Sequence, residues 1–180
     1  MKNFFKYNVG AAAGALVLIM MISVFAGINR TASTYKNKVL SEYGGKNSTV
    51  VSDISKYADH ASHLSAAAKA NGCDTSLLDG ALADLDMSDP FGGLSVRMND
   101  ILSQSNIVYA ELSAKKDVDA DQMRSATSYY YEMKSAEARL RNSDGYNDAA
   151  EKYNKLRNTF PANIISLGTK GGDAAVFWKK

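Results

Sequence analysis

Two patterns in this 180-residue sequence resemble part of a metal site: a pair of histidines and an alternating run of three aspartates. His60 and His63 are three positions apart, so on a helix they would occupy neighbouring positions of one face. A structural zinc ion takes four protein ligands, and no further histidine or cysteine completes such a set. We therefore predict no metal at this pair, and expect His60 to be partly buried beside Tyr57 and His63 to be exposed.

The run Asp117, Asp119 and Asp121 alternates as the first ligands of a calcium-binding loop do. The pattern then fails, because Gln122 stands where the loop needs glycine and Ser128 where it needs a bidentate glutamate. Carboxylates near the start of a helix are stabilised by the positive end of the helix dipole. We expect these aspartates to mark a helix that begins at about residues 119–121.

No arrangement of residues in the sequence indicates catalysis. Cys73 is followed by Asp74, and a neighbouring acid raises the pKa of a thiol and lowers its reactivity. No glutamate near a helical stretch has a histidine three residues later, the motif that holds metals in carboxylate bundles. The formal net charge of +2 excludes the strongly basic balance of a nucleic-acid-binding domain. We predict a protein that is not an enzyme, carries no cofactor and binds no nucleic acid.

The N-terminal segment has the length and composition of a membrane span. Residues 9–28 contain no charge and are interrupted only by glycines and Ser23. A helix of about twenty residues rises roughly 30 Å, the thickness of the hydrocarbon core of a bilayer. We predict a transmembrane anchor over residues 1–30, in which residues 9–28 contact the lipid bilayer.

A cleaved signal peptide is the alternative to an anchor. Lys2 and Lys6 would form its basic region, and Val24-Phe25-Ala26 is an acceptable cleavage site. The apolar stretch is longer than the roughly 7–15 residues of a usual signal peptide, which favours the anchor. The basic residues that flank the span differ by only one or two charges between its two ends, which gives a slight preference for a cytoplasmic domain.

Beyond residue 30, apolar residues recur at intervals of three and four, the period of an amphipathic helix. Such stripes cover residues 50–68, 77–85, 94–112 and 123–140, with Glu137 as a polar exception on the last. Helices joined by short loops favour an antiparallel bundle. We predict an all-α protein in which the transmembrane helix precedes an antiparallel four-helix-bundle-like domain over residues 31–168 and a tail over residues 169–180.

The most specific pattern is an aromatic residue at every seventh position near the C-terminus. The three dipeptides that carry it are Tyr146-Asn147, Tyr153-Asn154 and Phe160-Pro161. Seven residues make about two helical turns, so we expect the three rings to share one helix face and form a seam in the core. The asparagines that we expect to cap helices or bond between them are Asn147, Asn154 and Asn163.

This C-terminal run, YNDAAEKYNKLRNTFPANIIS, resembles the signature of LemA-family proteins, in which paired Tyr-Asn dipeptides lead into Phe-Pro-x-Asn and hydrophobic residues. A second stretch is similar to the family's apolar positions and to its Tyr-Ala-x-His motif, here Tyr57-Ala58-Asp59-His60. The order of a short N-terminus, one span and a helical bundle is similar as well. The motif positions that the resemblance marks as interaction candidates are Tyr57, His60, Tyr146, Asn147, Tyr153, Asn154, Phe160, Pro161 and Asn163.

The resemblance implies a single-pass protein of the bacterial cytoplasmic membrane and brings no established activity with it. The stretch between the span and the Tyr-Ala-x-His motif is short and contains Gly44-Gly45, so we expect the family's first bundle helix to be truncated or fused to the anchor. We predict a membrane-anchored scaffold or adaptor that acts through unidentified protein partners, with a homo-oligomer as one option. The alternative is an exported helical domain, released by signal peptidase, that works in the envelope or outside the cell.

The last five residues, Val176-Phe177-Trp178-Lys179-Lys180, combine aromatic and basic side chains. Such a tip suits the interface between membrane and water, where aromatic rings and lysines gather. A loose tail is the equal alternative at this stage.

Overall fold

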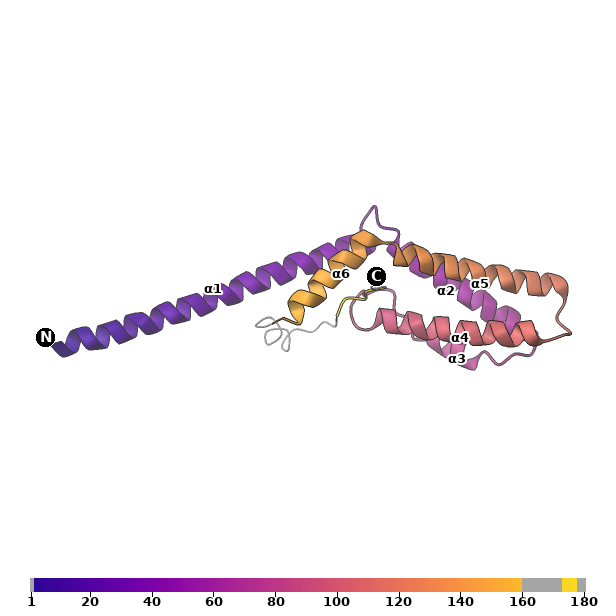
Figure 1. Cartoon of the computed structure of the whole chain (residues 1–180), viewed down its shortest axis with the longest axis horizontal. Helices are drawn as coiled ribbons and strands as arrows, with labels where there is room; N and C mark the ends of the chain where they lie inside the picture. The colour runs from indigo at the N-terminus through magenta and orange to yellow at the C-terminus, as the bar shows by residue number, and fades with distance from the viewer. Residues whose placement is uncertain (1, 160–172, 178–180) are drawn as a thin grey trace.

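The structure is a computed structural model that describes residues 2–159 and 173–177. Residues 2–159 form six helices, shown in Figure 1. They are α1 (Lys2–Gly44), α2 (Val50–Ala70), α3 (Ser76–Ala83), α4 (Leu94–Ala114), α5 (Ala120–Arg141) and α6 (Asp144–Arg157). Within the described ranges the only strand-like pairing is an isolated antiparallel bridge between Phe91 and Ala174. The all-α class, with a long N-terminal helix ahead of a helical bundle, is confirmed.

Helix α1 passes residue 30 without a break, so the apolar segment and the first helix of the domain are one element. From Ala13 onwards it is long and apolar enough to cross a membrane, and none of its most apolar stretch is buried by the rest of the protein. Of the side chains of α1 that the structure describes, only those of Val39 and Tyr43, near the end of α1, are buried against the other helices. The first part of α1 therefore projects away from the other helices (Figure 1).

A tight turn ends α1. The hydroxyl of Ser48 donates to the backbone carbonyl of Tyr43 at 2.8 Å and also to that of Glu42. These are carbonyls of the last helical turn, which have no partner within the helix. A Cβ atom on Gly45 would lie 2.1 Å from the carbonyl oxygen of Ser41, so only glycine fits this turn.

The bundle is built around α2 and α5, which make the most extensive contact between any two of the helices. The two run antiparallel, since Asp53 at the start of α2 pairs with Arg139 near the end of α5. Helix α4 covers this pair, and α3 packs mainly on α4. The large apolar side chains buried among these helices are Ile54, Leu64, Leu78, Ile101, Leu112, Met133 and Leu140.

The start of α5 agrees with the sequence prediction. Asp119 is the residue that caps the helix, and its carboxylate accepts hydrogen bonds from the backbone N–H groups of Asp121 and Gln122, at 2.9 and 3.3 Å. A side-chain acceptor at this position satisfies N–H groups that the helix leaves free.

A second helix pair lies at one end of the bundle. Helix α6 packs along the last part of α1 and runs back in the direction of the projecting segment (Figure 1). The rings of Tyr43 on α1 and Tyr146 on α6 have centroids 5.8 Å apart. Helix α1 is thereby joined directly to α6, the helix that carries the two Tyr-Asn pairs.

Candidate interaction site

The heptad spacing of α6 turns two tyrosine rings into the core. Tyr146 is only 1% exposed and lies between the rings of Tyr43 and Phe177, with a centroid distance of 5.2 Å to the latter. Tyr153 is also buried and meets the ring of Phe91 edge to face at 5.2 Å. Both tyrosines of the predicted seam therefore lie in the core, whereas its third ring, Phe160, lies outside the described residues.

Asn154, which follows the second tyrosine, binds the backbone of Ala174. The Nδ2 group of Asn154 donates to the carbonyl of Ala174 at 2.9 Å, and its Oδ1 accepts from the N–H of the same residue at 2.7 Å. The side-chain amide thus satisfies both backbone groups of one residue, as a neighbouring β-strand would.

The asparagine one heptad earlier joins three elements. The Nδ2 group of Asn147 donates to the carbonyls of Leu140 and Arg141 at the end of α5, at 3.1 and 3.3 Å. Its Oδ1 accepts from the backbone N–H of Phe177 at 3.1 Å. Asn147 therefore stabilises the end of one helix and at the same time holds an extended segment against another.

That extended segment is Asp173–Phe177, which we call the C-terminal segment. On the side away from α6 it pairs with residues 90–92, where the N–H of Ala175 donates to the carbonyl of Pro90 at 2.8 Å and the N–H of Gly92 donates to that of Asp173 at 3.4 Å. We call Asn147, Asn154 and residues 90–92 together the clamp. It binds main-chain groups from both sides, and this recognition does not depend on the identity of most of the bound side chains.

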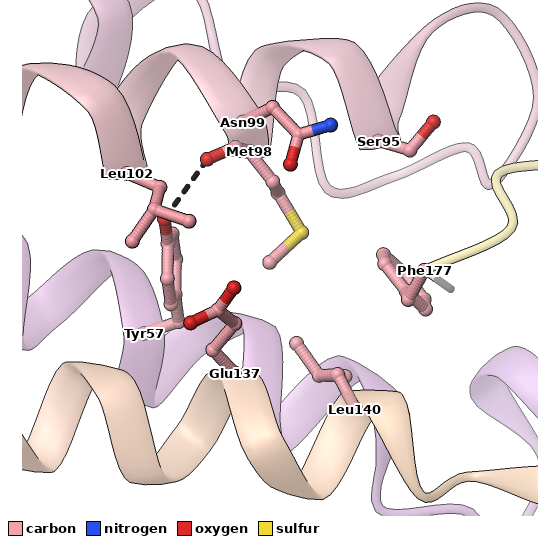
Figure 2. Close-up of a pocket in the computed structure, with 8 residues that line it drawn as sticks. All are labelled: Tyr57, Ser95, Met98, Asn99, Leu102, Glu137, Leu140 and Phe177. Atoms are coloured by element: carbon pink, nitrogen blue, oxygen red, sulfur yellow. Dashed lines mark hydrogen bonds between the residues drawn. The ribbon is translucent and has the colours of Figure 1, made fainter. Parts of the chain in front are cut away.

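One side chain of the C-terminal segment, the ring of Phe177, is buried in the core and packs on Tyr146. Phe177 is 5% exposed and closes a cavity of about 20 Å³ between α2, α4 and α5, enough for about one water molecule. The residues that line this cavity are Tyr57, Ser95, Met98, Asn99, Leu102, Glu137, Leu140 and Phe177. Figure 2 shows Met98 and Glu137 pointing into the space between Tyr57 and Phe177. Tyr57 of the first motif therefore lines the same cavity as Phe177, whose ring packs on Tyr146 of α6.

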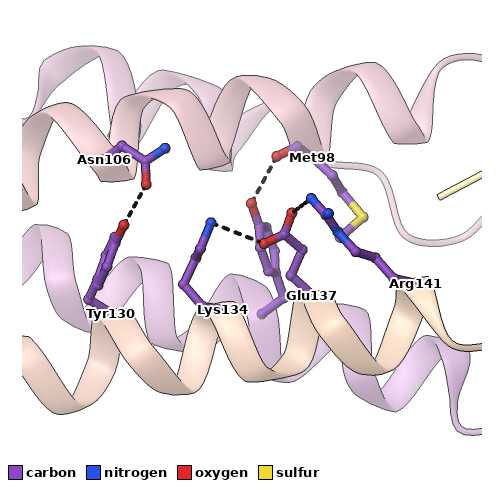
Figure 3. A network of polar contacts seen from close by, with 7 residues as sticks. Met98, Asn106, Tyr130, Lys134, Glu137 and Arg141 are labelled. Atoms are coloured by element: carbon purple, nitrogen blue, oxygen red, sulfur yellow. Dashed lines mark hydrogen bonds and ion pairs between the residues drawn. The ribbon is translucent and has the colours of Figure 1, made fainter. Parts of the chain in front are cut away.

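A buried carboxylate lies beside this cavity. Glu137 is 6% exposed and accepts a hydrogen bond from Arg141 at 2.6 Å, while the ammonium of Lys134 lies 3.3 Å away (Figure 3). The hydroxyl of the neighbouring Tyr57 donates to the carbonyl of Met98 at 2.9 Å. Burial, and to a smaller degree the charge of Glu137, raises the pKa of Tyr57 well above its usual range. This explains the polar exception on the apolar stripe of α5: two cations partner Glu137.

The histidines lie apart from the clamp. His60 is half-buried and His63 exposed, as expected, and both rings stack on Tyr129, with centroid distances of 6.4 and 5.1 Å. Among the described residues no group of three or more His, Cys, Asp or Glu side chains is placed to hold a metal ion.

The cysteine is a buried, free thiol. Burial and the charge of Glu111 across the helix interface raise the pKa of Cys73, so the direction predicted from sequence holds but the responsible acid is Glu111 and not Asp74.

Of the predicted site residues, Asn147 and Asn154 bond the backbone of the C-terminal segment and Tyr146 packs on Phe177. Tyr153 packs on Phe91 of the clamp, and Tyr57 lines the cavity that Phe177 also lines. Phe160, Pro161 and Asn163 lie outside the described residues. The sequence did not predict Phe177 as part of the site: we expected it to belong to a membrane-facing tip over residues 176–180 or to a loose tail. The burial of Phe177 against Tyr146 excludes both roles for this ring. Residues 178–180 of this tip lie outside the described residues.

No family model, curated protein or solved structure matches this chain. The similarity to LemA-family proteins therefore stays a prediction that rests on the motif residues themselves.

Proposed function

We propose that the protein is a membrane-anchored helical adaptor, a LemA-like scaffold of the bacterial cytoplasmic membrane that acts by binding other proteins and not by catalysis. The observation that carries this proposal is the continuity of α1. One helix contains the apolar segment and, without a linker, the buried residues Val39 and Tyr43 of the domain.

The length of α1 supports a domain held close to the bilayer. Between Ile28, the end of the proposed span, and Val39 the helix rises about 16 Å at 1.5 Å per residue. A rigid connection of this length fixes the height and the orientation of the bundle above the membrane. Fixed presentation of binding surfaces is what a scaffold needs. The slight excess of basic residues after the span favours the cytoplasmic side.

The alternative function is that of an exported domain released by signal peptidase. Cleavage after Ala26 would remove the projecting half of α1, while Val39 and Tyr43 would stay packed on the bundle. The released fragment would keep its core, so the fold is compatible with either fate. Recovery of peptides from residues 1–26 in the mature protein supports the anchor, and their complete loss supports release.

The anchor and its orientation are tested by cysteine labelling. Cys73 is a poor reporter because it is buried, whereas Tyr131 is 61% exposed on α5. We would place a cysteine there (Tyr131→Cys) in a Cys73→Ala background and treat intact and lysed cells with a membrane-impermeant maleimide. We expect the chain to stay in carbonate-washed membranes and to be labelled only after lysis. Labelling in intact cells would put the domain on the outer side, and release by carbonate would contradict the anchor.

The adaptor role is tested by crosslinking in cells. Ile107 on α4 and Tyr131 on α5 are large exposed side chains, at 57% and 61%. A photoreactive amino acid at either position should give adducts with other proteins, and these adducts should be lost when residues 1–28 are deleted and the domain is no longer anchored. Adducts that persist on the domain without the span would contradict a role that depends on the membrane.

A further inference from the structure

The clamp holds the C-terminal segment entirely through contacts that do not require the two to belong to one chain. Five backbone hydrogen bonds join them: two to Asn154, one to Asn147 and one each with Pro90 and Gly92. Phe177 supplies an aromatic anchor, and the small side chains of Ala174 and Ala175 are buried as well, each at 3% exposure. Edge pairing with main-chain groups and pockets for selected side chains together define a site for an extended peptide.

We propose that the clamp binds the C-terminal segment of a second copy of this chain, so that neighbouring molecules in the membrane exchange these segments and associate. The second copy is the occupant whose fit the structure demonstrates, because it carries the same Ala-Ala-x-Phe sequence that fills the site. The proposal rests on the membrane anchoring inferred above.

The connection is long enough for exchange. Fifteen residues, 158–172, separate Arg157 at the end of α6 from Asp173, although an ion pair of 2.9 Å brings these two side chains together. A chain of this length spans at most about 50–54 Å when fully extended. Two α-helices side by side are roughly 20–24 Å wide, so the reach covers an adjacent bundle.

Anchoring in one membrane holds the clamp of one copy and the C-terminal segment of the next at the same height above the bilayer. The clamp lies beside α1 between Lys36, whose ammonium is 5.3 Å from the ring centroid of Phe91, and Tyr43, which packs on Tyr146. These positions are about 12–22 Å above the end of the proposed span at Ile28. Copies anchored in one membrane hold their clamps at this common height, so that exchange needs only lateral movement.

Exchange replaces each contact by an identical one, which is why swapping of an element is a low-cost route to oligomers. The intramolecular form has the advantage of a tethered segment, whose effective concentration is on the order of millimolar. Confinement in the membrane raises the concentration of neighbouring copies and opposes this advantage. We therefore expect a mixture of closed and exchanged forms that shifts with the density of the protein.

The test traps the exchanged form with a disulfide. Phe91 and Ala174 form an antiparallel bridge, and bridge partners have Cα atoms about 4.5–5.5 Å apart, a separation that a disulfide accepts. Full-length chains with two different tags would be co-expressed, one with Phe91→Cys and one with Ala174→Cys, both with Cys73→Ala. Mild oxidation of the membranes should then yield a disulfide-linked dimer that carries both tags.

One further substitution separates exchange from chance collision. In the Phe91→Cys chain, Phe177→Ala weakens the binding of that chain's own C-terminal segment to its clamp. The segment of the Ala174→Cys chain then meets less competition for the clamp, and the dimer yield should rise severalfold. The same substitution in the Ala174→Cys chain weakens the donated segment and should lower the yield severalfold. Asp148→Ala, on the exposed side of α6, is the matched control and should change neither yield.

A chain with both Phe91→Cys and Ala174→Cys reports whether the clamp tolerates the cysteines. An internal disulfide in this chain, with no mixed dimer from the single variants, would overturn the proposal. If no internal disulfide forms, the cysteines are not tolerated, and the proposal is tested instead by co-expressing differently tagged chains without cysteine substitutions. These should co-purify, and should cease to do so when both carry Phe177→Ala; failure to co-purify overturns exchange. Carbonate extraction of the same membranes tests separately whether the chain is anchored, so that failure of exchange and failure of anchoring can be distinguished.

Discussion

Arg139, two residues before the end of α5, donates from Nε to the carboxylate of Asp53 in the first turn of α2 at 2.8 Å. Asp53 is 3% exposed, whereas the side chain of Arg139 is 42% exposed. The guanidinium therefore covers a carboxylate that would otherwise be buried alone. This contact joins the first turn of α2 to the last turns of α5, the two helices with the largest mutual contact.

Replacement of Arg139 by alanine should destabilise the domain by about 1–2 kcal/mol. Loss of a partner from a fully buried ion pair costs about 3–5 kcal/mol, and the exposure of Arg139 reduces this through solvent screening. Urea denaturation in detergent micelles measures the change. Arg124→Ala is the control, because the Arg124–Asp121 pair is 82% and 85% exposed and should contribute less than about 0.5 kcal/mol. Equal effects of the two substitutions would contradict a structural role for the Asp53 pair.

Truncation of Tyr153 to alanine should be far more costly. Its ring is buried against Phe91, and removal of a large aromatic side chain from a core costs about 3–5 kcal/mol. Tyr131→Ala is the matched control, since that ring is 61% exposed and its loss should stay within about 0.5 kcal/mol. Thermal melts followed by circular dichroism compare the two. A melt of the Tyr153→Ala protein that equals the wild-type melt would contradict its place in the core.

The helices were predictable from sequence because their signals are local. The spacing of Val50, Ile54, Tyr57, Ala61 and Leu64 fixes the buried face of α2, and each of these except Val50, at 3%, is at most 1% exposed. Apolar residues at intervals of three and four identify such a face from the sequence alone. The sequence prediction left open whether the first helix of the domain is truncated or continuous with the apolar segment, and α1 shows continuity. No glycine or proline stands between Gly27 and Gly44 to break the helix.

The clamp was not predictable because the residues that form it are far apart in the sequence. The C-terminal segment shows no alternation of polar and apolar residues, and its extended form depends on Asn154, twenty residues earlier, and on residues 90–92. The Tyr-Asn spacing located α6 and its buried face correctly. The prediction that the asparagines cap helices or bond between them agrees with the bonds of Asn147 to the carbonyls of Leu140 and Arg141 at the end of α5. The spacing did not reveal that Asn147 and Asn154 also bond the backbone of the C-terminal segment, because nothing in a heptad identifies the partner of a polar side chain.

Stability should decrease above pH 10 because of buried tyrosines. Burial is the main cause that raises the pKa values of Tyr57 and Tyr146 above the ordinary value of 10.0. The unfolded chain thus loses these protons at a lower pH than the folded chain does. Stability from this source is fully present below about pH 10 and is lost as the pH rises further. Urea midpoints between pH 8 and 11 measure the loss, and Tyr57→Phe should reduce its slope. A midpoint that is constant to pH 11 would contradict the burial of these hydroxyls.

The same two tyrosines should respond in opposite ways when only the hydroxyl is removed. Tyr57 donates to the carbonyl of Met98, so Tyr57→Phe loses a buried hydrogen bond and should cost about 1 kcal/mol. The buried hydroxyl of Tyr146 has no hydrogen-bond partner among the described residues, and burial of an unsatisfied hydroxyl is unfavourable. Tyr146→Phe keeps the ring contacts with Tyr43 and Phe177 and should therefore be neutral or stabilising. Urea denaturation of both variants at pH 7 decides the matter, since each is the control for the other. A loss near 1 kcal/mol in Tyr146→Phe would contradict this prediction and show that the hydroxyl of Tyr146 takes part in a stabilising hydrogen bond.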